Sequence, residues 1–110
     1  MSFSPPLPAP IARYFAANPS FDVEGMLAPF AADAVVVDER QTRTGTDELR
    51  AWITEATVGV KAISTPVSAT QEDDRHIVVA NVAGDFPGSP VPLTFRFQLA
   101  GEEISHLEIV

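Results

Sequence analysis

The sequence predicts an α+β domain in which three N-terminal helices pack on the concave face of a curved, mostly antiparallel sheet. Two observations carry this prediction. Apolar residues recur at helical spacing in the first half of the chain, whereas strand-like runs with short turns fill the second half. Strands joined by short links pair antiparallel, and helices grouped ahead of strands are typical of α+β folds.

The length and composition indicate one globular domain spanning residues 1–110. The chain is 45% hydrophobic and 20% charged, which is typical of a folded domain. The net charge of −8 argues against binding to nucleic acid or to an anionic membrane. There is no cysteine, the start lacks the features of a signal peptide, and no apolar run is long enough to cross a membrane. We therefore expect a cytoplasmic protein.

The first half of the chain is predicted to contain an extended arm, three helices and one strand. Prolines crowd residues 1–10, which favours the arm, and a first helix starts at Pro10. A second helix begins near Ser20 or Asp22 and carries apolar residues as far as Phe30. A strand at 34–38 precedes a turn through "ERQTRTG", and a third helix runs from an N-cap at Thr46 to near Gly59.

Four strands are predicted in the second half, at residues 62–70, 76–82, 91–99 and 103–109. The turns between them are "QEDDR", "GDFPGSP" and "LAGEE". Together with the helices, these strands leave room for a pocket between the sheet and the helices.

Asp38 and Tyr14 are the candidate catalytic residues. Asp38 follows four apolar strand residues, so it either begins a surface loop or stands in the wall of an apolar cavity and transfers protons there. Tyr14 is the only tyrosine, on an apolar helix face, where it is either core packing or a hydrogen-bond donor to a ligand.

Several further residues are candidates for the walls of the pocket. They are Trp52, Phe86, Phe95, Phe97 and His106. His106 lies on the face opposite Leu107 and Ile109, and the sequence leaves open which face lines the pocket. The two histidines show no metal-ligand spacing, and no phosphate loop or nucleophile elbow is present, so no metal or cofactor is expected.

The segment "ARYFAANPSFDVEGMLAPFAADAVVVDE" and the later "GTDELRAW" resemble the nuclear transport factor 2-like, or SnoaL-like, superfamily. The domains of this superfamily are cone-shaped barrels, and residues 12–39 resemble its ketosteroid isomerase branch without a gap. In that alignment Tyr14 takes the place of the tyrosine that donates to the substrate oxyanion, and Asp38 that of the proton-transferring carboxylate. Phe95 stands where the isomerases carry a second, protonated carboxylic acid.

The resemblance implies an enzyme that moves a proton next to a carbonyl or enone of a small apolar molecule, in the manner of an isomerase or a polyketide cyclase. The alternative is a non-catalytic domain that binds a lipid-like or aromatic ligand, because this fold carries many functions. Members of the superfamily usually form homodimers. We expect a dimer on the outer face of the sheet, with Leu107 and Ile109 turned outward and His106 in the pocket.

Overall fold

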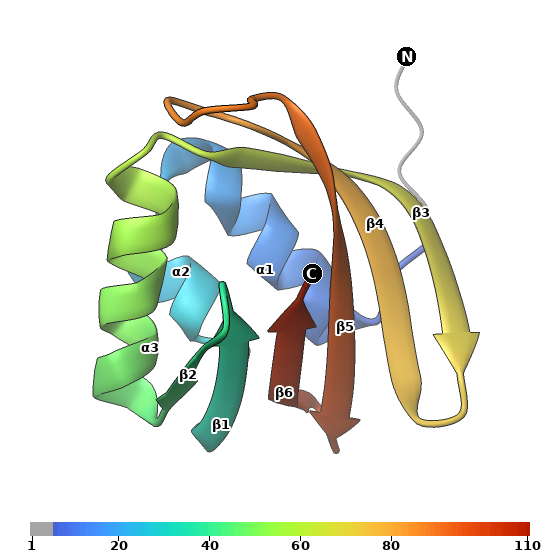
Figure 1. Cartoon of the computed structure of the whole chain (residues 1–110). Helices are drawn as coiled ribbons and strands as arrows, with labels where there is room; N and C mark the ends of the chain where they lie inside the picture. Colours follow the sequence, from blue (N-terminus) through green and yellow to red (C-terminus); the bar gives the residue numbers. More distant parts are fainter. Residues whose placement is uncertain (1–5) are drawn as a thin grey trace.

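The computed structural model describes residues 6–110 and contains one six-stranded mixed sheet with helices on its concave face (Figure 1). The strand order is β2-β1-β6-β5-β4-β3, and β2 and β3 form free edges, so the sheet is open. The pair β1–β6 is parallel, and all other pairs are antiparallel. The predicted fold class is confirmed, and the helices rather than a closed barrel complete the cone.

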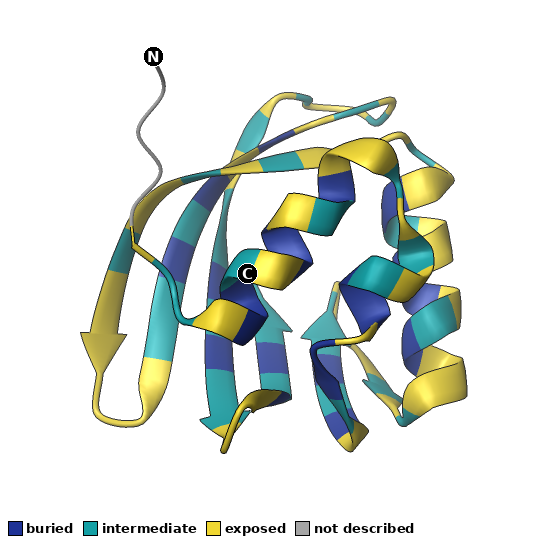
Figure 2. Ribbon diagram, turned by 180° about the vertical axis from the view of Figure 1, so that it is seen from behind, coloured by how far each residue is buried: buried dark blue, intermediate teal, exposed yellow. Residues whose placement is uncertain are grey.

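Helix α1 (Ala9–Ala17) crosses the inner face of the sheet. Pro10 lies in its first turn, where the missing N–H removes no helical hydrogen bond. Pro10, Ile11, Tyr14 and Phe15 form its buried face, visible as the dark stripe in Figure 2. Of the predicted arm, residues 1–5 lie outside the described part of the chain.

The short helices η1 (Asn18–Ser20) and α2 (Val23–Leu27) follow α1. Asp22 caps α2 by accepting a hydrogen bond from the backbone N–H of Gly25. The predicted extension of this helix to Phe30 is wrong. Pro29 interrupts the helix, and Phe30 is already the first residue of the next strand.

Strand β1 (Phe30–Asp38) begins four residues earlier than predicted and pairs with β2 (Gln41–Thr44), a segment that was predicted to be a turn. Glu39 and Arg40 join the two strands with positive φ angles of 52° and 65°. Two consecutive residues of this kind make the tight hairpin turn that suits the twist of paired strands.

Helix α3 (Thr46–Ile53) stands beside β1 and β2 and continues through η2 (Thr54–Val58), a wider π-helical turn. Its N-cap is Gly45, with φ of 88°, rather than the predicted Thr46. The π-helical turn ends at Val58 with Gly59 as its C-cap, close to the predicted stop.

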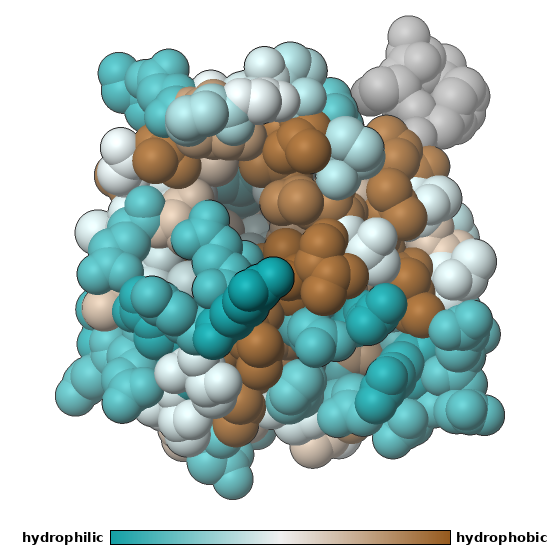
Figure 3. All heavy atoms as spheres, in the orientation of Figure 1, coloured by the Kyte–Doolittle hydropathy of each residue, from teal (hydrophilic) through white to brown (hydrophobic). Residues whose placement is uncertain are grey.

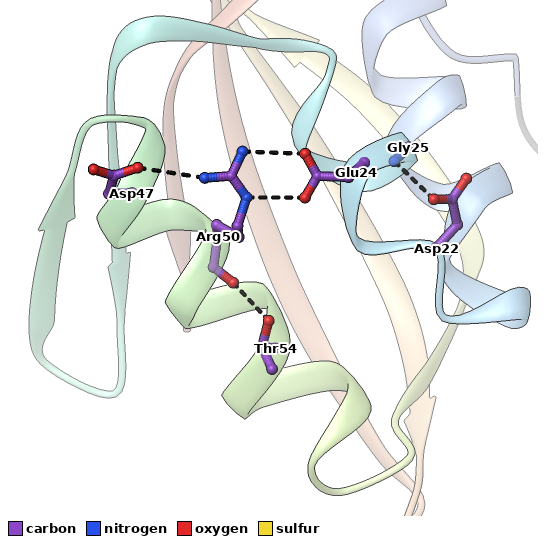
Figure 4. Close-up of polar contacts among 6 residues, drawn as sticks. All are labelled: Asp22, Glu24, Gly25, Asp47, Arg50 and Thr54. Carbon is purple, nitrogen blue, oxygen red and sulfur yellow. Dashed lines mark hydrogen bonds and ion pairs between the residues drawn. The ribbon is translucent and has the colours of Figure 1, made fainter.

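An ion pair between Arg50 and Glu24 connects α3 to α2 (Figure 4). Arg50 donates to both carboxylate oxygens of Glu24, at 2.9 and 3.1 Å, and contacts Asp47 on its own helix. The Arg50 guanidinium lowers the pKa of Glu24, and the hydroxyl of Thr54 donates to the Arg50 carbonyl one turn later. Both members of the α2–α3 pair are exposed, so the pair fixes an orientation more than it adds stability.

The remaining strands are β3 (Ile63–Glu72), β4 (Arg75–Ala83), β5 (Val91–Ala100) and β6 (Glu103–Ile109), close to the predicted ranges. Their inward residues alternate with outward ones. Val78, Ala80, Phe95, Phe97 and Leu107 are buried against the helices. No helix in the described part of the chain is long and apolar enough to cross a membrane.

Candidate functional site

A cavity of about 520 Å³ lies between α3–η2 and the inner face of the sheet. In the space-filling view it is a hollow, bordered by hydrophobic residues on one side and by hydrophilic residues on the other (Figure 3). Aromatic and aliphatic side chains make up most of the lining, and a few polar and charged groups converge on it. Such a composition is typical of sites for small molecules.

Asp38 lines this cavity at the end of β1. The strand pairs there with both neighbours, because Asp38 lies opposite Gln41 of β2 and Ile109 of β6. The side chain is half-buried, and its Oδ2 accepts a hydrogen bond of 2.9 Å from Nε1 of Trp52. An apolar strand runs into this carboxylate because its end forms part of the cavity wall.

Trp52 lies on the buried face of α3 and donates the hydrogen bond to Asp38. The indole is 4% exposed and packs edge-on against Phe30, with ring centroids 6.4 Å apart. Because this ring is fixed by packing, its N–H presents a fixed donor to one carboxylate oxygen of Asp38. The other oxygen, Oδ1, accepts no hydrogen bond from residues 6–110.

Tyr14 reaches the same cavity from α1. Its ring is 4% exposed and makes edge-on contacts with Phe15, Phe30 and Phe97 at centroid distances of 5.1, 5.7 and 6.0 Å. Its hydroxyl makes no hydrogen bond within the described residues. The hydroxyl oxygen is not fully buried, because no fully buried side-chain oxygen among these residues lacks a hydrogen-bond partner. The hydroxyl is therefore open to the cavity.

Burial raises the pKa of Tyr14 well above its ordinary value of 10.0, and the negative charge of Asp38 raises it further. Tyr14 thus remains a neutral phenol that can donate a hydrogen bond. Tyr14 and Asp38 both line the cavity.

The structure brings together five of the seven predicted site residues. Tyr14, Asp38, Trp52, Phe86 and Phe95 line the cavity. Phe86 comes from the loop between β4 and β5, and Phe95 comes from the inner face of β5.

Phe97 and His106 are not among the residues that line the cavity. Phe97 points inward but is fully buried and stacks on Phe95, with centroids 6.2 Å apart. The placement of His106 in the pocket is wrong. Leu107 is fully buried and Ile109 lines the cavity, so alternation along β6 turns His106 to the outer face.

Sequence reasoning missed three charged residues at the rim, Glu39, Arg43 and Glu55. Glu39 lies in the turn between β1 and β2. Arg43 and Glu55 form an ion pair of 2.8 Å between β2 and η2. Arg43 sits in a short polar strand without an apolar pattern, and Glu55 lies in the π-helical turn. Neither element has a clear signal in the sequence.

Comparison with known proteins now assigns the family. The SnoaL-like domain matches residues 11–107, and the chain belongs to this family. A "putative polyketide cyclase" from Sinorhizobium meliloti is 36% identical in sequence, with a TM-score of 0.89, over 94% of this chain and 95% of that one.

More distant solved structures share the fold. A protein from Catenulispora acidiphila with a ketosteroid isomerase-like fold, solved with trimethylamine, is 23% identical over 96% of this chain and 86% of its own, with a TM-score of 0.78. The epoxide hydrolase/cyclase-like enzyme SalBIII, which takes part in pyran ring formation in salinomycin, is 16% identical over 92% and 86%, with a TM-score of 0.75. No curated protein matches the sequence.

Proposed function

We propose that the cavity binds a small apolar molecule bearing a carbonyl or enone and that Asp38 moves a proton on it. The observation that carries this proposal is the convergence of Asp38 and Tyr14 on one largely apolar cavity. Family membership and the similarity to a protein named as a polyketide cyclase support a cyclase-type or ligand-binding function.

In the proposed reaction, Asp38 takes a proton from the carbon next to the carbonyl. The electron pair of the broken C–H bond moves to the carbonyl oxygen, and the hydroxyl of Tyr14 donates a hydrogen bond to the resulting enolate. An isomerase then returns the proton from Asp38 to another carbon. A cyclase instead uses the enolate carbon to attack a second carbonyl of the same molecule. A carbon–carbon bond forms, the π bond of that carbonyl breaks, and its oxygen takes the proton back from Asp38 to become a hydroxyl.

Trp52 has a positioning role in this scheme. Its N–H holds Oδ2 of Asp38, so that Oδ1 is the oxygen available to the substrate. General base catalysis by a positioned carboxylate contributes about 10²–10⁴ in rate.

Phe95 argues against a true steroid isomerase. It lines the cavity where that branch carries a second oxyanion donor, and it has no polar group. Loss of one such donor typically costs about 10²–10³ in rate. The proposed activity is therefore a slower proton transfer or a cyclisation that needs one donor.

Deuterium exchange tests the proposal. The protein is incubated in D₂O with 2-cyclohexenone and related simple enones, and exchange at carbon is followed by NMR for wild type, Asp38→Asn and Tyr14→Phe. We expect exchange with wild type, none above background with Asp38→Asn and a slower rate with Tyr14→Phe. Binding of a ligand without exchange of any enone would instead identify a non-catalytic binding domain.

We also propose a homodimer, with an interface that differs from the one predicted from the sequence. Since Leu107 and Ile109 face inward, they cannot form the interface. The outer face of the sheet carries no helix (Figure 1) and presents half-buried apolar residues around the Arg96–Glu108 ion pair of 3.0 Å. These residues are Val35, Val37, Ile77 and Val79. Light scattering should give about twice the 11.8 kDa mass of the chain.

A further inference from the structure

The cavity has a buried end and a charged rim. Tyr14, Trp52 and Phe95 are at most 4% exposed and form the buried end. Glu39 and Glu55 are exposed and line the rim. A ligand that places its reacting carbonyl near Tyr14 therefore directs the other end of its body toward the charged rim.

Among the described residues that line the cavity, Arg43 is the single cationic side chain, whereas Asp38, Glu39 and Glu55 are anionic. The Arg43 guanidinium already donates to Glu55 at 2.8 Å and to the side-chain carbonyl of Gln41 at 3.3 Å. Its side chain is 24% exposed, compared with 64% for Glu55. The one positive group at the rim is thus neutralised by a neighbour before any ligand arrives.

The π-helical turn places Glu55 in this position. The N–H of Gly59 bonds to the carbonyl of Thr54 at 2.8 Å, which is the longer spacing of a π-turn. Such turns are rare in proteins and are frequently found at functional sites. Here the wide turn carries Glu55, Ala56 and Thr57, and all three line the cavity.

We infer that Glu55 sets the charge preference of the cavity, so that its ligand is electroneutral at the rim, as an ester, ketone or alcohol is, and not a free carboxylic acid. This inference rests on the proposed function of the cavity as a ligand site. A carboxylate entering the rim would meet Glu39 directly and would have to compete with Glu55 for Arg43. A neutral group loses nothing to either carboxylate.

A matched pair of probes tests this inference. Methyl 2-naphthoate and 2-naphthoate differ only in charge and one methyl group, and calorimetry measures the affinity of each at neutral pH and about 0.15 M salt. The ratio of the two affinities is compared among wild type, Glu55→Gln, Arg43→Gln and the control Glu72→Gln. Glu72 ends β3, eight residues and roughly 26 Å along the strand from the cavity residue Ser64.

Wild type should bind the ester in preference to the acid. Glu55→Gln removes the ion-pair partner of Arg43, so the Arg43 guanidinium can bind the carboxylate of the acid. The ratio of ester affinity to acid affinity should therefore fall about tenfold, as expected for one charge within a few ångströms of the ligand at a protein surface. Arg43→Gln should widen the ratio, and Glu72→Gln should leave it at the wild-type value. The exposed positions of Glu55 and Glu72 favour normal folding of these variants, which circular dichroism checks.

Equal affinity of wild type for acid and ester, or an unchanged ratio in Glu55→Gln, overturns the inference and leaves the proposed function standing. A wild-type protein that binds neither probe contradicts the proposed ligand site itself, and the inference is rejected with it.

Discussion

Replacing Tyr14 by phenylalanine separates the role of its hydroxyl from that of its ring. The ring contacts three other aromatic side chains, and Phe preserves these contacts. The hydroxyl makes no hydrogen bond within the described residues, so the usual loss of about 1 kcal/mol per hydrogen bond does not apply. At neutral pH, Tyr14→Phe should therefore change the free energy of unfolding by less than about 0.5 kcal/mol.

At alkaline pH the two proteins should differ. Because the folded state raises the pKa of Tyr14 above 10.0, the unfolded chain loses this proton first, and wild type loses stability as the pH rises above that value. Near pH 11 this loss amounts to about 1.4 kcal/mol, and Tyr14→Phe lacks it. Tyr14 contributes nothing to the pH dependence below this range.

Urea unfolding followed by the fluorescence of Trp52, the only tryptophan, measures both quantities. Other titrating groups cancel when the two proteins are compared at each pH. Parallel stability curves from neutral pH to about pH 11 would show that burial does not hold the phenol neutral. A loss of several kcal/mol at neutral pH would show instead that the hydroxyl bonds a buried group of the protein.

Three further substitutions test the core, the cavity wall and the outer face. Phe97→Ala removes a fully buried ring and should cost about 3–5 kcal/mol in urea unfolding; a cost below about 1 kcal/mol would mean that Phe97 is not in the core. Asn18→Ala should cost about 2 kcal/mol, because its side chain bonds the Ala62 carbonyl at 2.9 Å and the Ser64 N–H at 2.6 Å and so ties η1 to the cavity wall. His106→Ala should leave the free energy of binding of methyl 2-naphthoate, measured by calorimetry, within about 0.5 kcal/mol of wild type. A larger loss would indicate that His106 contacts the ligand in the cavity.

Much of the fold could be predicted from periodicity. The apolar spacing of Ile11, Tyr14 and Phe15 marked the buried face of α1, and short turns marked the antiparallel strands. Strand β2 was missed because "QTRT" is a polar edge strand. Such a strand is fixed by backbone pairing with β1, which leaves no apolar pattern.

The site was predicted in part. The carboxylate at the end of an apolar strand and the lone tyrosine pointed to the cavity, and both line it. Alternation along β6 placed His106 opposite Leu107, but a period of two assigns residues to faces without saying which face is inside. The burial of Leu107 against the helices decides that question, and it is a tertiary effect.

The indole N–H signal of Trp52 in a ¹⁵N–¹H spectrum tests the central claim most directly, because the chain has one tryptophan and its N–H bonds Asp38 inside the cavity. Methyl 2-naphthoate is titrated into labelled protein. If the ligand site is the cavity walled by Asp38 and Trp52, this signal shifts and saturates with the affinity measured by calorimetry. Saturable binding of the ester with the indole signal unmoved would place the ligand elsewhere and contradict the account.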